Sequence, residues 1–477
     1  MTSSVPGRPA PSVPLIEQAL APFVRFSQVE ASGGIVLIAC TVAALLWANS
    51  PYAPAYFALW DSHVTVGFGD MVLSKTLLHW INDGLMAVFF FMVGLEIKRE
   101  VLVGELNSPR QAALPVAAAI GGMAVPAAIY AALNTGQASL AGWGIPMATD
   151  IAFALGILSL LGNRVPASLK VFLAAVAIVD DIGAVLVIAV FYSGDLSLFA
   201  LVVGGAMFVA MLTANVMGVR HSGVYLILGT VLWLAFLKSG VHATIAGVVA
   251  AMAIPARTRI DGETFAAKAR RLLGCFERAG GNGEPLLANK AQMAALDAIE
   301  EACRKAGAPL PRIEHALHPV VAYGIMPVFA LANAGVALSG EAARSLGEPV
   351  SLGIILGLVL GKQCGIFAAC LGMFKLGLTA PQAGARLGHY YGVACLAGIG
   401  FTMSIFIAGL AFGDQGALDA TAKLAVLVAS TISGLLGYLV LRSQGGSDEA
   451  AEAACAAEAA GPEAACPGVS GPCRDAS

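Results

Sequence analysis

Two adjacent aspartates interrupt a long apolar run and are the clearest candidates for chemistry in this sequence. Asp180 and Asp181 follow the run from Val171 to Val179, and apolar residues resume at Ile182. A carboxylate in hydrocarbon costs about 2.5–3.5 kcal/mol on insertion scales, so two in succession need strong compensation. Consecutive helical residues point about 100° apart, so the pair can serve two neighbours, a water-filled cavity and a cation within the protein. The alternative is that a partner helix merely satisfies one or both.

Lys362 is the only basic residue well inside a predicted span, directly after the apolar stretch 357–361. A lysine in that position must either pair with an acidic group or lose its proton. Asp180 or Asp181 is the simplest choice of partner, because each needs a compensating group. Asp150 is a competitor that the sequence does not exclude.

Thr149 and Asp150 fall in the middle of a short apolar run that also contains Pro146. This pattern predicts an interrupted helix, although Thr149 could instead bond a local carbonyl with Asp150 acting only as a cap. The glycine-containing stretch 398–404 predicts a second interrupted helix. Interruptions in corresponding spans of two halves indicate a transporter binding site.

A second set of titratable residues lies at the ends of predicted spans. Histidines titrate near neutral pH, so a pH-responsive role is open; so is the alternative of an ordinary charged helix end and a packed histidine. His242 lies near one membrane face. The residues near the other face close the second span and open the ninth: Glu96, Lys98, Arg99, Glu100, Glu314, His315 and His318.

Long apolar helices must position these residues. The chain has 477 residues, of which 58% are hydrophobic and 12% charged, with a mean hydropathy of +0.80. Soluble domains carry about 25% charged residues, so a soluble fold is excluded. A bilayer core of about 30 Å needs about 20 apolar residues per helix. We therefore predict an all-α polytopic membrane protein of about twelve spans, the second and eighth being short: 33–49, 80–97, 112–133, 143–162, 170–193, 196–217, 223–238, 241–255, 318–338, 351–374, 389–412 and 422–441.

The distribution of basic residues predicts the orientation. Most Lys and Arg lie on one side of this layout; the other side holds only Lys75, Lys238, Arg344 and Lys423. The positive-inside rule then places both termini in the cytoplasm. Spans 3–5 and 10–12 run in opposite directions, as inverted repeats require, and the two interrupted helices, spans four and eleven, would bring half-helix ends to the midplane. Asp150 and Lys362 have the signs needed to neutralise those ends.

Four segments lie outside the helix bundle in this interpretation. Residues 1–25 form a cytoplasmic N-terminal segment, and 443–477 a cytoplasmic tail whose Ala, Glu, Gly, Pro and Ser composition predicts disorder. The domain 26–442 contains a charged cytoplasmic insertion, 256–312, with helical patterning. Residues 64–74 predict a hairpin with its turn at 67–70; its exposed edge could pair with a second copy or pack on its own chain.

The remaining composition excludes other classes. A net charge of −3 supplies no basic surface for nucleic acid. The nine cysteines have no metal-binding spacing and no disulfide pattern, and we predict no cofactor. The first 25 residues show no cleaved signal peptide.

Five motifs make the chain similar to a known family. From about residue 25 to 441 it resembles the bacterial sodium/proton antiporters of the NhaA family. The resemblance is carried by the sequences GLEIKRE at 94–100, ATDIAFA at 148–154, VDDIGA at 179–184, KSGVHAT at 238–244 and GIGFTMS at 398–404.

The resemblance implies a bacterial inner-membrane transporter, not an enzyme, that exchanges cytoplasmic Na⁺ or Li⁺ for external H⁺ in sodium and pH homeostasis. It implies electrogenic exchange of roughly two protons per Na⁺, activated at alkaline pH. Asp180 and Asp181 would bind the ion and protons, with Asp181 the stronger cation ligand and Lys362 the partner of Asp180. Thr149 would support the Na⁺ site, with Asp150, at the helix crossing.

The resemblance also implies a homodimer that forms through the 64–74 hairpin in membrane lipid. It assigns the response to pH to seven residues: Glu96, Arg99, Glu100, His242, Glu314, His315 and His318.

Other functions are weaker on the residues alone. A proton- or sodium-coupled symporter of an organic solute would need a further polar or aromatic pocket near the midplane. A membrane enzyme would need substrate-binding groups at a membrane face, whereas the aspartates lie mid-span. A structural protein would not require Asp180, Asp181 and Lys362 in hydrocarbon.

Overall fold

The fold is described from a computed structural model of the chain. It describes residues 32–68, 71–194, 196–256, 260–280, 285, 288–382, 384–413 and 415–444. The predicted segment 1–25 and nearly all of the predicted tail lie outside these residues. In the first half the elements are α2 (Ser32–Ala48), α3 (Ala53–Asp61), β1 (His63–Phe68), β2 (Met71–Thr76), α4 (Leu77–His79), η1 (Trp80–Leu85), α5 (Met86–Val103), α6 (Pro109–Leu133), η2 (Ala138–Met147), α7 (Ile151–Leu160), η3 (Gly162–Arg164), α8 (Ala167–Phe191), α9 (Leu198–Val216) and α10 (Ser222–Leu237).

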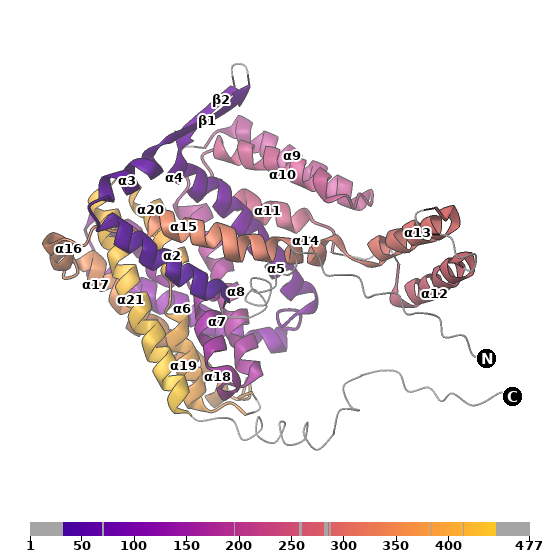
Figure 1. Ribbon diagram of the computed structural model, residues 1–477. Helices are drawn as coiled ribbons and strands as arrows, with labels where there is room; N and C mark the ends of the chain where they lie inside the picture. The colour runs from indigo at the N-terminus through magenta and orange to yellow at the C-terminus, as the bar shows by residue number, and fades with distance from the viewer. Residues whose placement is uncertain are drawn as a thin grey trace, which may run out of the picture.

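The second half continues as a series of helices that returns to the same bundle (Figure 1). Its elements are α11 (Ile245–Ala253), α12 (Gly262–Ala279), α13 (Lys290–Ala306), α14 (Pro309–Val320), η5 (Val321–Ile325), α15 (Met326–Asn333), α16 (Gly340–Ser345), α17 (Pro349–Leu356), η6 (Gly357–Gly361), α18 (Lys362–Lys375), α19 (Leu387–Ala397), α20 (Phe401–Phe412) and α21 (Gly416–Ser443).

Long apolar helices dominate the molecule, which confirms the predicted all-α polytopic membrane fold. In the described residues, seven helices are long and apolar enough to cross a bilayer, and nine if each of two bent pairs is one span. Each of the twelve predicted spans corresponds to one helix or to a run of consecutive helices. Some of these helices are too short to cross a bilayer alone, among them α10 with 16 residues and α11 with 9.

The ninth span begins earlier than predicted. We expected 318–338, whereas α14, η5 and α15 run continuously from Pro309 to Asn333. The first turns of α14 carry Glu314 and His315, so their mean hydropathy is low and an apolar run cannot reveal them.

The two interrupted helices are present and cross one another. In span four, a 3₁₀ helix, η2, ends at Met147 and α7 begins at Ile151; in span eleven, α19 ends at Ala397 and α20 begins at Phe401 with a 42° bend. The Asp150 amide donates to the Ile399 carbonyl at 2.6 Å, which joins the two breaks directly.

Two glycines bring the first helices of the predicted repeats into backbone contact. A Cβ added at Gly121 of α6 would lie 2.4 Å from the Gly365 carbonyl of α18, and one at Gly365 would lie 2.1 Å from the Gly121 carbonyl. Small residues allow such close approach in membranes. The contact fixes α18, and therefore Lys362, against α6.

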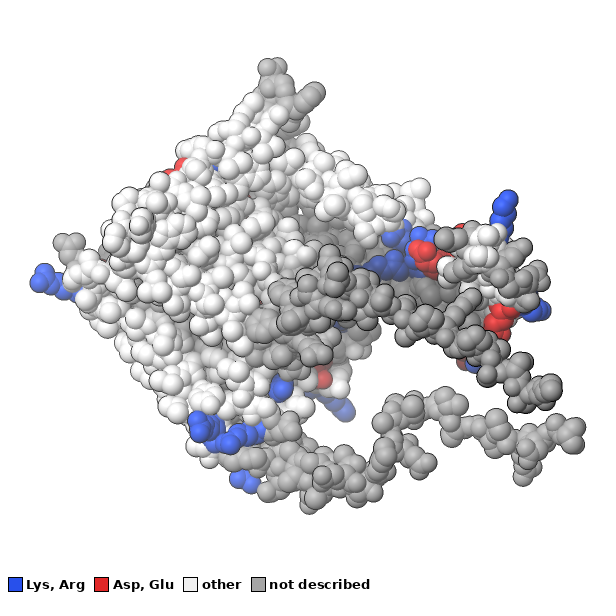
Figure 2. Space-filling view, viewed as in Figure 1, with Lys and Arg blue, Asp and Glu red and all other residues white. Residues whose placement is uncertain are grey.

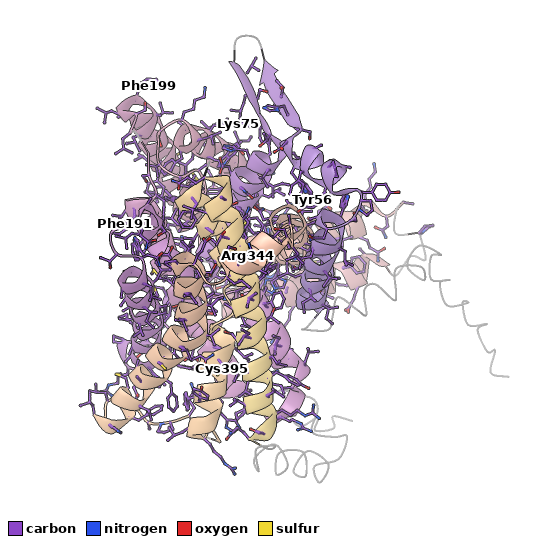
Figure 3. The ribbon with its side chains drawn as sticks, turned by 90° about the vertical axis from the view of Figure 1, so that its left-hand side faces the viewer. Tyr56, Lys75, Phe191, Phe199, Arg344 and Cys395 are labelled. Carbon is purple, nitrogen blue, oxygen red and sulfur yellow. The ribbon has the colours of Figure 1, made fainter. Side chains whose placement is uncertain are left out.

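The predicted hairpin is a two-stranded antiparallel sheet. β1 pairs with β2 in the register Val64 to Lys75 through Phe68 to Met71. The strands extend further than predicted, because Gly67 and Phe68 belong to β1 rather than to the turn, whose residues 69–70 are not described. Figures 1 and 3 show the hairpin projecting beyond one end of the helices.

The 256–312 insertion contains two helices, α12 and α13, as its patterning predicted. They pack against each other and project from the side of the bundle (Figure 1). Figure 2 shows Lys, Arg, Asp and Glu gathered over these helices and along the lower edge, whereas the face over α2 and α3 is almost free of charge. That distribution suits an uncharged belt in lipid with polar regions outside it.

Candidate functional site

The paired aspartates lie in the middle of α8 and are shielded from solvent. Asp180 is 1% exposed and Asp181 3%. The surrounding residues of α8 are almost all apolar, so the helix itself offers these carboxylates no polar partner. Each therefore depends on groups from other helices.

Lys362 is the partner of Asp180. Its ammonium lies 2.7 Å from Asp180 Oδ2, both side chains are fully buried, and it also donates to the Met147 carbonyl at the end of η2. The structure thus decides between the three acidic residues that the sequence left open as partners. Breaking a buried pair leaves an uncompensated charge, so each member holds the other in place.

Thr149 connects the first break to Asp180. Its hydroxyl lies 2.6 Å from Asp180 Oδ2 and 3.0 Å from the Ala397 carbonyl of the other interrupted helix. A hydroxyl has one proton, so it donates to one of these oxygens at a time. Thr149 therefore does not bond a local carbonyl, which was the alternative for this residue.

Asp150 caps both interrupted helices rather than pairing with Lys362. Its Oδ1 accepts from the Phe153 amide at 3.0 Å, and its Oδ2 accepts from the amide and the hydroxyl of Thr402 at 3.0 and 2.5 Å. A carboxylate near two helix N-termini is favoured by both dipoles. The position predicted at the helix crossing is the observed one.

Asp181 presents the least engaged carboxylate of the group. Among the described residues, its Oδ1 and that of Asp180 are buried without a hydrogen-bond partner. Such oxygens are acceptors for a proton or ligands for a hard cation. The Thr149 hydroxyl supplies a third oxygen beside Asp180. Oxygen donors of this kind suit a hard cation, and Na⁺ binding by Asp181, Asp180 and Thr149 stays a prediction.

Three of the seven residues predicted to respond to pH lie together. Arg99 of α5 contacts Glu314 of α14 at 2.6 Å and Glu100 at 3.2 Å. Glu96 is half-buried on the same helix. The cluster ties α5 to α14.

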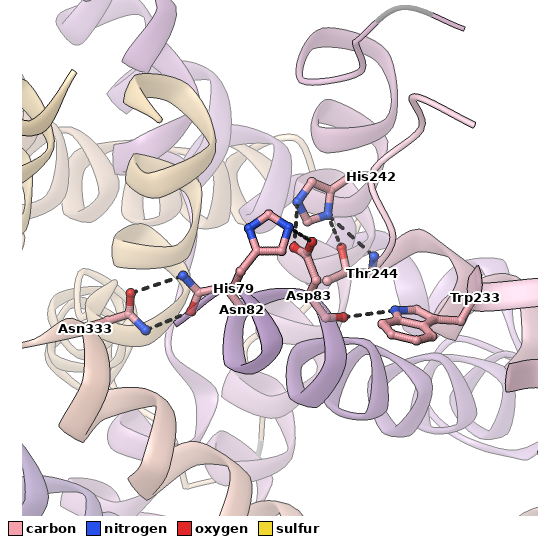
Figure 4. A network of polar contacts seen from close by, with 7 residues as sticks. All are labelled: His79, Asn82, Asp83, Trp233, His242, Thr244 and Asn333. Atoms are coloured by element: carbon pink, nitrogen blue, oxygen red, sulfur yellow. Dashed lines mark hydrogen bonds and ion pairs between the residues drawn. The ribbon is translucent and has the colours of Figure 1, made fainter. Parts of the chain in front are cut away.

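The histidines of that set do not join this cluster. His315 and His318 are exposed on α14, and the His315 ring contacts the Pro311 carbonyl of its own helix. His242 belongs to a separate network (Figure 4): it contacts Thr244 at 2.7 Å and lies 3.7 Å from Asp83.

Sequence reasoning missed Asp83 and His79, which complete the network around His242. His79 Nε2 lies 2.8 Å from Asp83 Oδ2, and η1, which carries Asp83, is also tied to α15 by reciprocal Asn82–Asn333 hydrogen bonds (Figure 4). The available signal was a carboxylate within the predicted span 80–97, the criterion that identified Asp180.

The comparisons with known proteins agree with the motifs. A family model described as "Na+/H+ antiporter 1" matches residues 24–441. The chain is 59% identical to the Na(+)/H(+) antiporter NhaA of Oleidesulfovibrio alaskensis, over 90% of this chain and 95% of the relative.

More distant relatives cover the same region. The chain is 48% identical to the Na(+)/H(+) antiporter NhaA of Rhodospirillum rubrum, over 89% of this chain and 97% of the relative. It is 46% identical to that of Koribacter versatilis, over 94% and 97%. The match includes both helix breaks and the buried aspartates; the chain belongs to the NhaA-type Na⁺/H⁺ antiporter family of membrane transporters and is not an enzyme.

Proposed function

We propose that this chain exchanges cytoplasmic Na⁺ or Li⁺ for external H⁺ at Asp180 and Asp181. The observation that carries the proposal is the asymmetry of two adjacent buried carboxylates. Lys362 and Thr149 both contact Oδ2 of Asp180, whereas no ion pair holds Asp181 among the described residues; the Oδ1 atoms of both residues have no hydrogen-bond partner there. Asp181 is then the principal cation ligand, and the oxygens of Asp180 and Thr149 complete the site.

Exchange follows from competition for the same negative charge. A buried carboxylate is stabilised by a proton or by a cation, but both cannot occupy the same oxygen. Na⁺ arriving from the cytoplasm displaces protons, and protons arriving from outside displace Na⁺. Since an ionised, unoccupied site is costly in hydrocarbon, it crosses the membrane in one of the two loaded states.

Counting charge at the site predicts electrogenic exchange. With both aspartates protonated and Lys362 charged, the site carries one positive charge; with both ionised and one Na⁺ bound, it carries none. If Asp181 and Lys362 carry the protons instead, the difference is again one charge. Roughly two protons per Na⁺ therefore move one net charge, worth about 2.3 kcal/mol per 100 mV.

The crossed breaks support alternating access. Asp150 neutralises the N-terminal ends of α7 and α20, and Lys362 donates to the Met147 carbonyl at the C-terminal end of η2. With these dipole ends compensated, the helices carrying the ion site can move as one body relative to the remaining helices.

Activation at alkaline pH follows from the same competition, because protons leave the carboxylates as the pH rises and Na⁺ can then bind. The Arg99, Glu100 and Glu314 cluster, with Glu96, His242, His315 and His318, is the proposed regulatory set. The transporter acts without a cofactor in a bacterial inner membrane, with both termini cytoplasmic, in sodium and pH homeostasis. A homodimer in membrane lipid forms through the 64–74 hairpin.

An organic-solute symporter is disfavoured by the nature of the cavities. A cavity of about 360 Å³ lies between α5, α10, α11 and α14 and has a mostly apolar lining. A second cavity of about 270 Å³ has polar lining residues that include Glu105, Arg110 and Gln382, but neither lining includes the aspartates. A solute carrier needs polar groups that orient its substrate beside the coupling-ion site.

The test is recovery of an imposed pH gradient in inverted vesicles. Na⁺ and Li⁺ should collapse the gradient in vesicles containing the protein, K⁺ should not, and vesicles lacking the protein should respond to none of them. Absence of a Na⁺-dependent change with confirmed protein in the membrane would refute the proposed function.

A further inference from the structure

The break in span eleven leaves backbone groups inside the membrane that its own residues cannot satisfy. Gly400 is the N-cap of α20 and has no side chain with which to cap it. The crossing demands this glycine, because a Cβ there would lie 2.2 Å from Ser404 Oγ and 3.1 Å from the Ala148 carbonyl. Unsatisfied amides are expensive in hydrocarbon, so other helices must supply the cap.

Two other elements supply it. The Thr402 amide donates to Asp150, from the first break, whereas the Phe401 amide donates to Ser430 Oγ of α21 at 3.1 Å. α21 packs along both α19 and α20, and Figure 3 shows it as the yellow helix spanning the height of the bundle. Ser430 is 8% exposed, so its hydroxyl is committed to the break rather than to water.

A second hydroxyl of α21 faces the other end of the same break. Ser433, one turn further on, is fully buried, and its Oγ has no protein partner among the described residues. A Cβ added at Gly398 would lie 2.8 Å from this oxygen and 2.5 Å from the Leu358 carbonyl. Leu358 belongs to η6, the π-helical turn that directly precedes Lys362.

The break is mechanically connected to the ion site at both ends. Its Ala397 carbonyl shares the Thr149 hydroxyl with Asp180, and Leu358 lies four residues before Lys362, the partner of Asp180. A shift of residues 398–400 therefore changes whether Thr149 donates to Asp180. It also displaces the turn that aims the lysine.

We propose that Ser430 and Ser433 are positioning residues for the ion site. α21 presents two hydroxyls to the two ends of the second break: Ser430 fixes the break in this conformation, and Ser433 takes a backbone carbonyl of the break when it moves. The inference rests on the proposed exchange function. Hydroxyls suit this role better than carboxylates. A further buried carboxylate would need a cationic partner, and Lys362 is already paired with Asp180.

Thr431 provides a matched control on the same helix. It is exposed, and its hydroxyl donates to the Leu427 carbonyl of its own helix. Thr431→Val therefore removes a hydroxyl between the two serines that does not touch the break.

The experiment measures Na⁺-dependent exchange by Ser430→Ala, Ser430→Thr and Thr431→Val in proteoliposomes over a range of pH. Ser430→Ala should raise the Na⁺ concentration for half-maximal exchange by about three- to tenfold, the scale of one buried hydrogen bond, and shift the pH profile. Ser430→Thr, which keeps the hydroxyl, should restore both, and Thr431→Val should match wild type.

Ser433→Ala gives an independent readout that does not depend on the folding of Ser430→Ala. Removing a buried hydroxyl without a protein partner should leave thermal stability unchanged or raised. The maximal exchange rate should nevertheless fall by about two- to tenfold. The reason is that the backbone carbonyl of the moving break loses the hydroxyl that would donate to it.

Two results would overturn the inference while leaving the proposed function standing. In the first, the wild type is active, but Ser430→Ala and Thr431→Val have the same Na⁺ concentration for half-maximal exchange and the same pH profile. In the second, Ser433→Ala has an unchanged maximal rate. Inactive wild-type protein would instead refute the exchange function itself.

Discussion

At the scale of single residues, two neighbouring carboxylates have different roles in the site. Lys362 and Thr149 both contact Oδ2 of Asp180, so that residue anchors the site, whereas Asp181 has no ion-pair partner among the described residues. Two carboxylates in identical surroundings would not differ in this way. The difference arises because consecutive helical positions face different neighbours.

Replacing Asp181 should abolish transport without removing the protein from the membrane. We expect Asp181→Ala to lose Na⁺-dependent dissipation of the pH gradient, because an apolar group binds neither Na⁺ nor H⁺. Glu301→Ala is the control: Glu301 pairs with Lys305 at 2.6 Å on the surface of α13, and its loss should leave exchange close to wild type. Near-normal exchange by Asp181→Ala at a comparable protein level would contradict the assignment.

The sequence could predict which residues are unusual but not which of them meet. Asp180, Asp181 and Lys362 were identified because charge in hydrocarbon is costly, yet the partner of Lys362 depended on how α18 packs on α6. Ser430 was not predicted, because a serine inside an apolar helix can satisfy its hydroxyl locally and leaves no pattern.

At the scale of elements, close backbone packing places Lys362. Gly365 lies one turn after the lysine and touches the Gly121 backbone of α6, while Gly372 of the same helix α18 has no neighbouring atom within 4 Å of a Cβ. Gly365 and Gly372 therefore lie on the same helix but differ in packing, which makes them a matched pair for mutation.

Gly365→Ala should separate α18 from α6. We expect a loss of about 1–3 kcal/mol of stability and weaker Na⁺ binding, because backbone atoms cannot move aside as a side chain can. Gly372→Ala should leave both unchanged or slightly raise the stability, since alanine favours a helix interior. Thermal unfolding and the half-saturation for Na⁺ measure the two effects. Equal behaviour of the variants would show that the contact does not position the lysine.

Spans were predictable, but their internal irregularities were not. Apolar length identified a helix or helix run for every predicted span, and Pro146 with Thr149 and Asp150 located the first break. The π-helical turns η1, η5 and η6 were not predicted, because a π turn adds a residue without a distinctive side chain. The early start of α14 was missed because its first turns are polar.

At the scale of the whole molecule, the hairpin is the proposed contact between two copies. Its strands expose Val64, Val66 and Val72, and both lie beyond the helices (Figure 3). A paired edge would cover this surface.

Replacing residues 64–75 by a short Gly-Ser linker should convert a dimer into a monomer in detergent, as measured by light scattering after size exclusion. Thr65→Ala removes only the Thr65–Ser74 side-chain contact at 2.9 Å and should remain dimeric. A linker variant that stays dimeric would place the interface elsewhere.

The membrane voltage should drive transport by the whole molecule. In proteoliposomes with a potassium-valinomycin potential and no pH gradient, we expect Na⁺ movement whose direction follows the sign of the potential. One charge per cycle makes 100 mV worth more than a tenfold shift in the equilibrium. Indifference of the flux and of its end point to the potential would exclude two protons per Na⁺.

Release of protons by Na⁺ tests the central claim most directly, because the account requires both ions to compete for Asp180 and Asp181. The measurement adds NaCl to the purified protein in weakly buffered solution and follows the pH with a dye, with choline chloride as the ionic-strength control. We expect Na⁺ and Li⁺ to release roughly two protons per bound ion from the wild type. Asp181→Ala should release none. Na⁺ binding without proton release beyond the choline control would contradict a shared site.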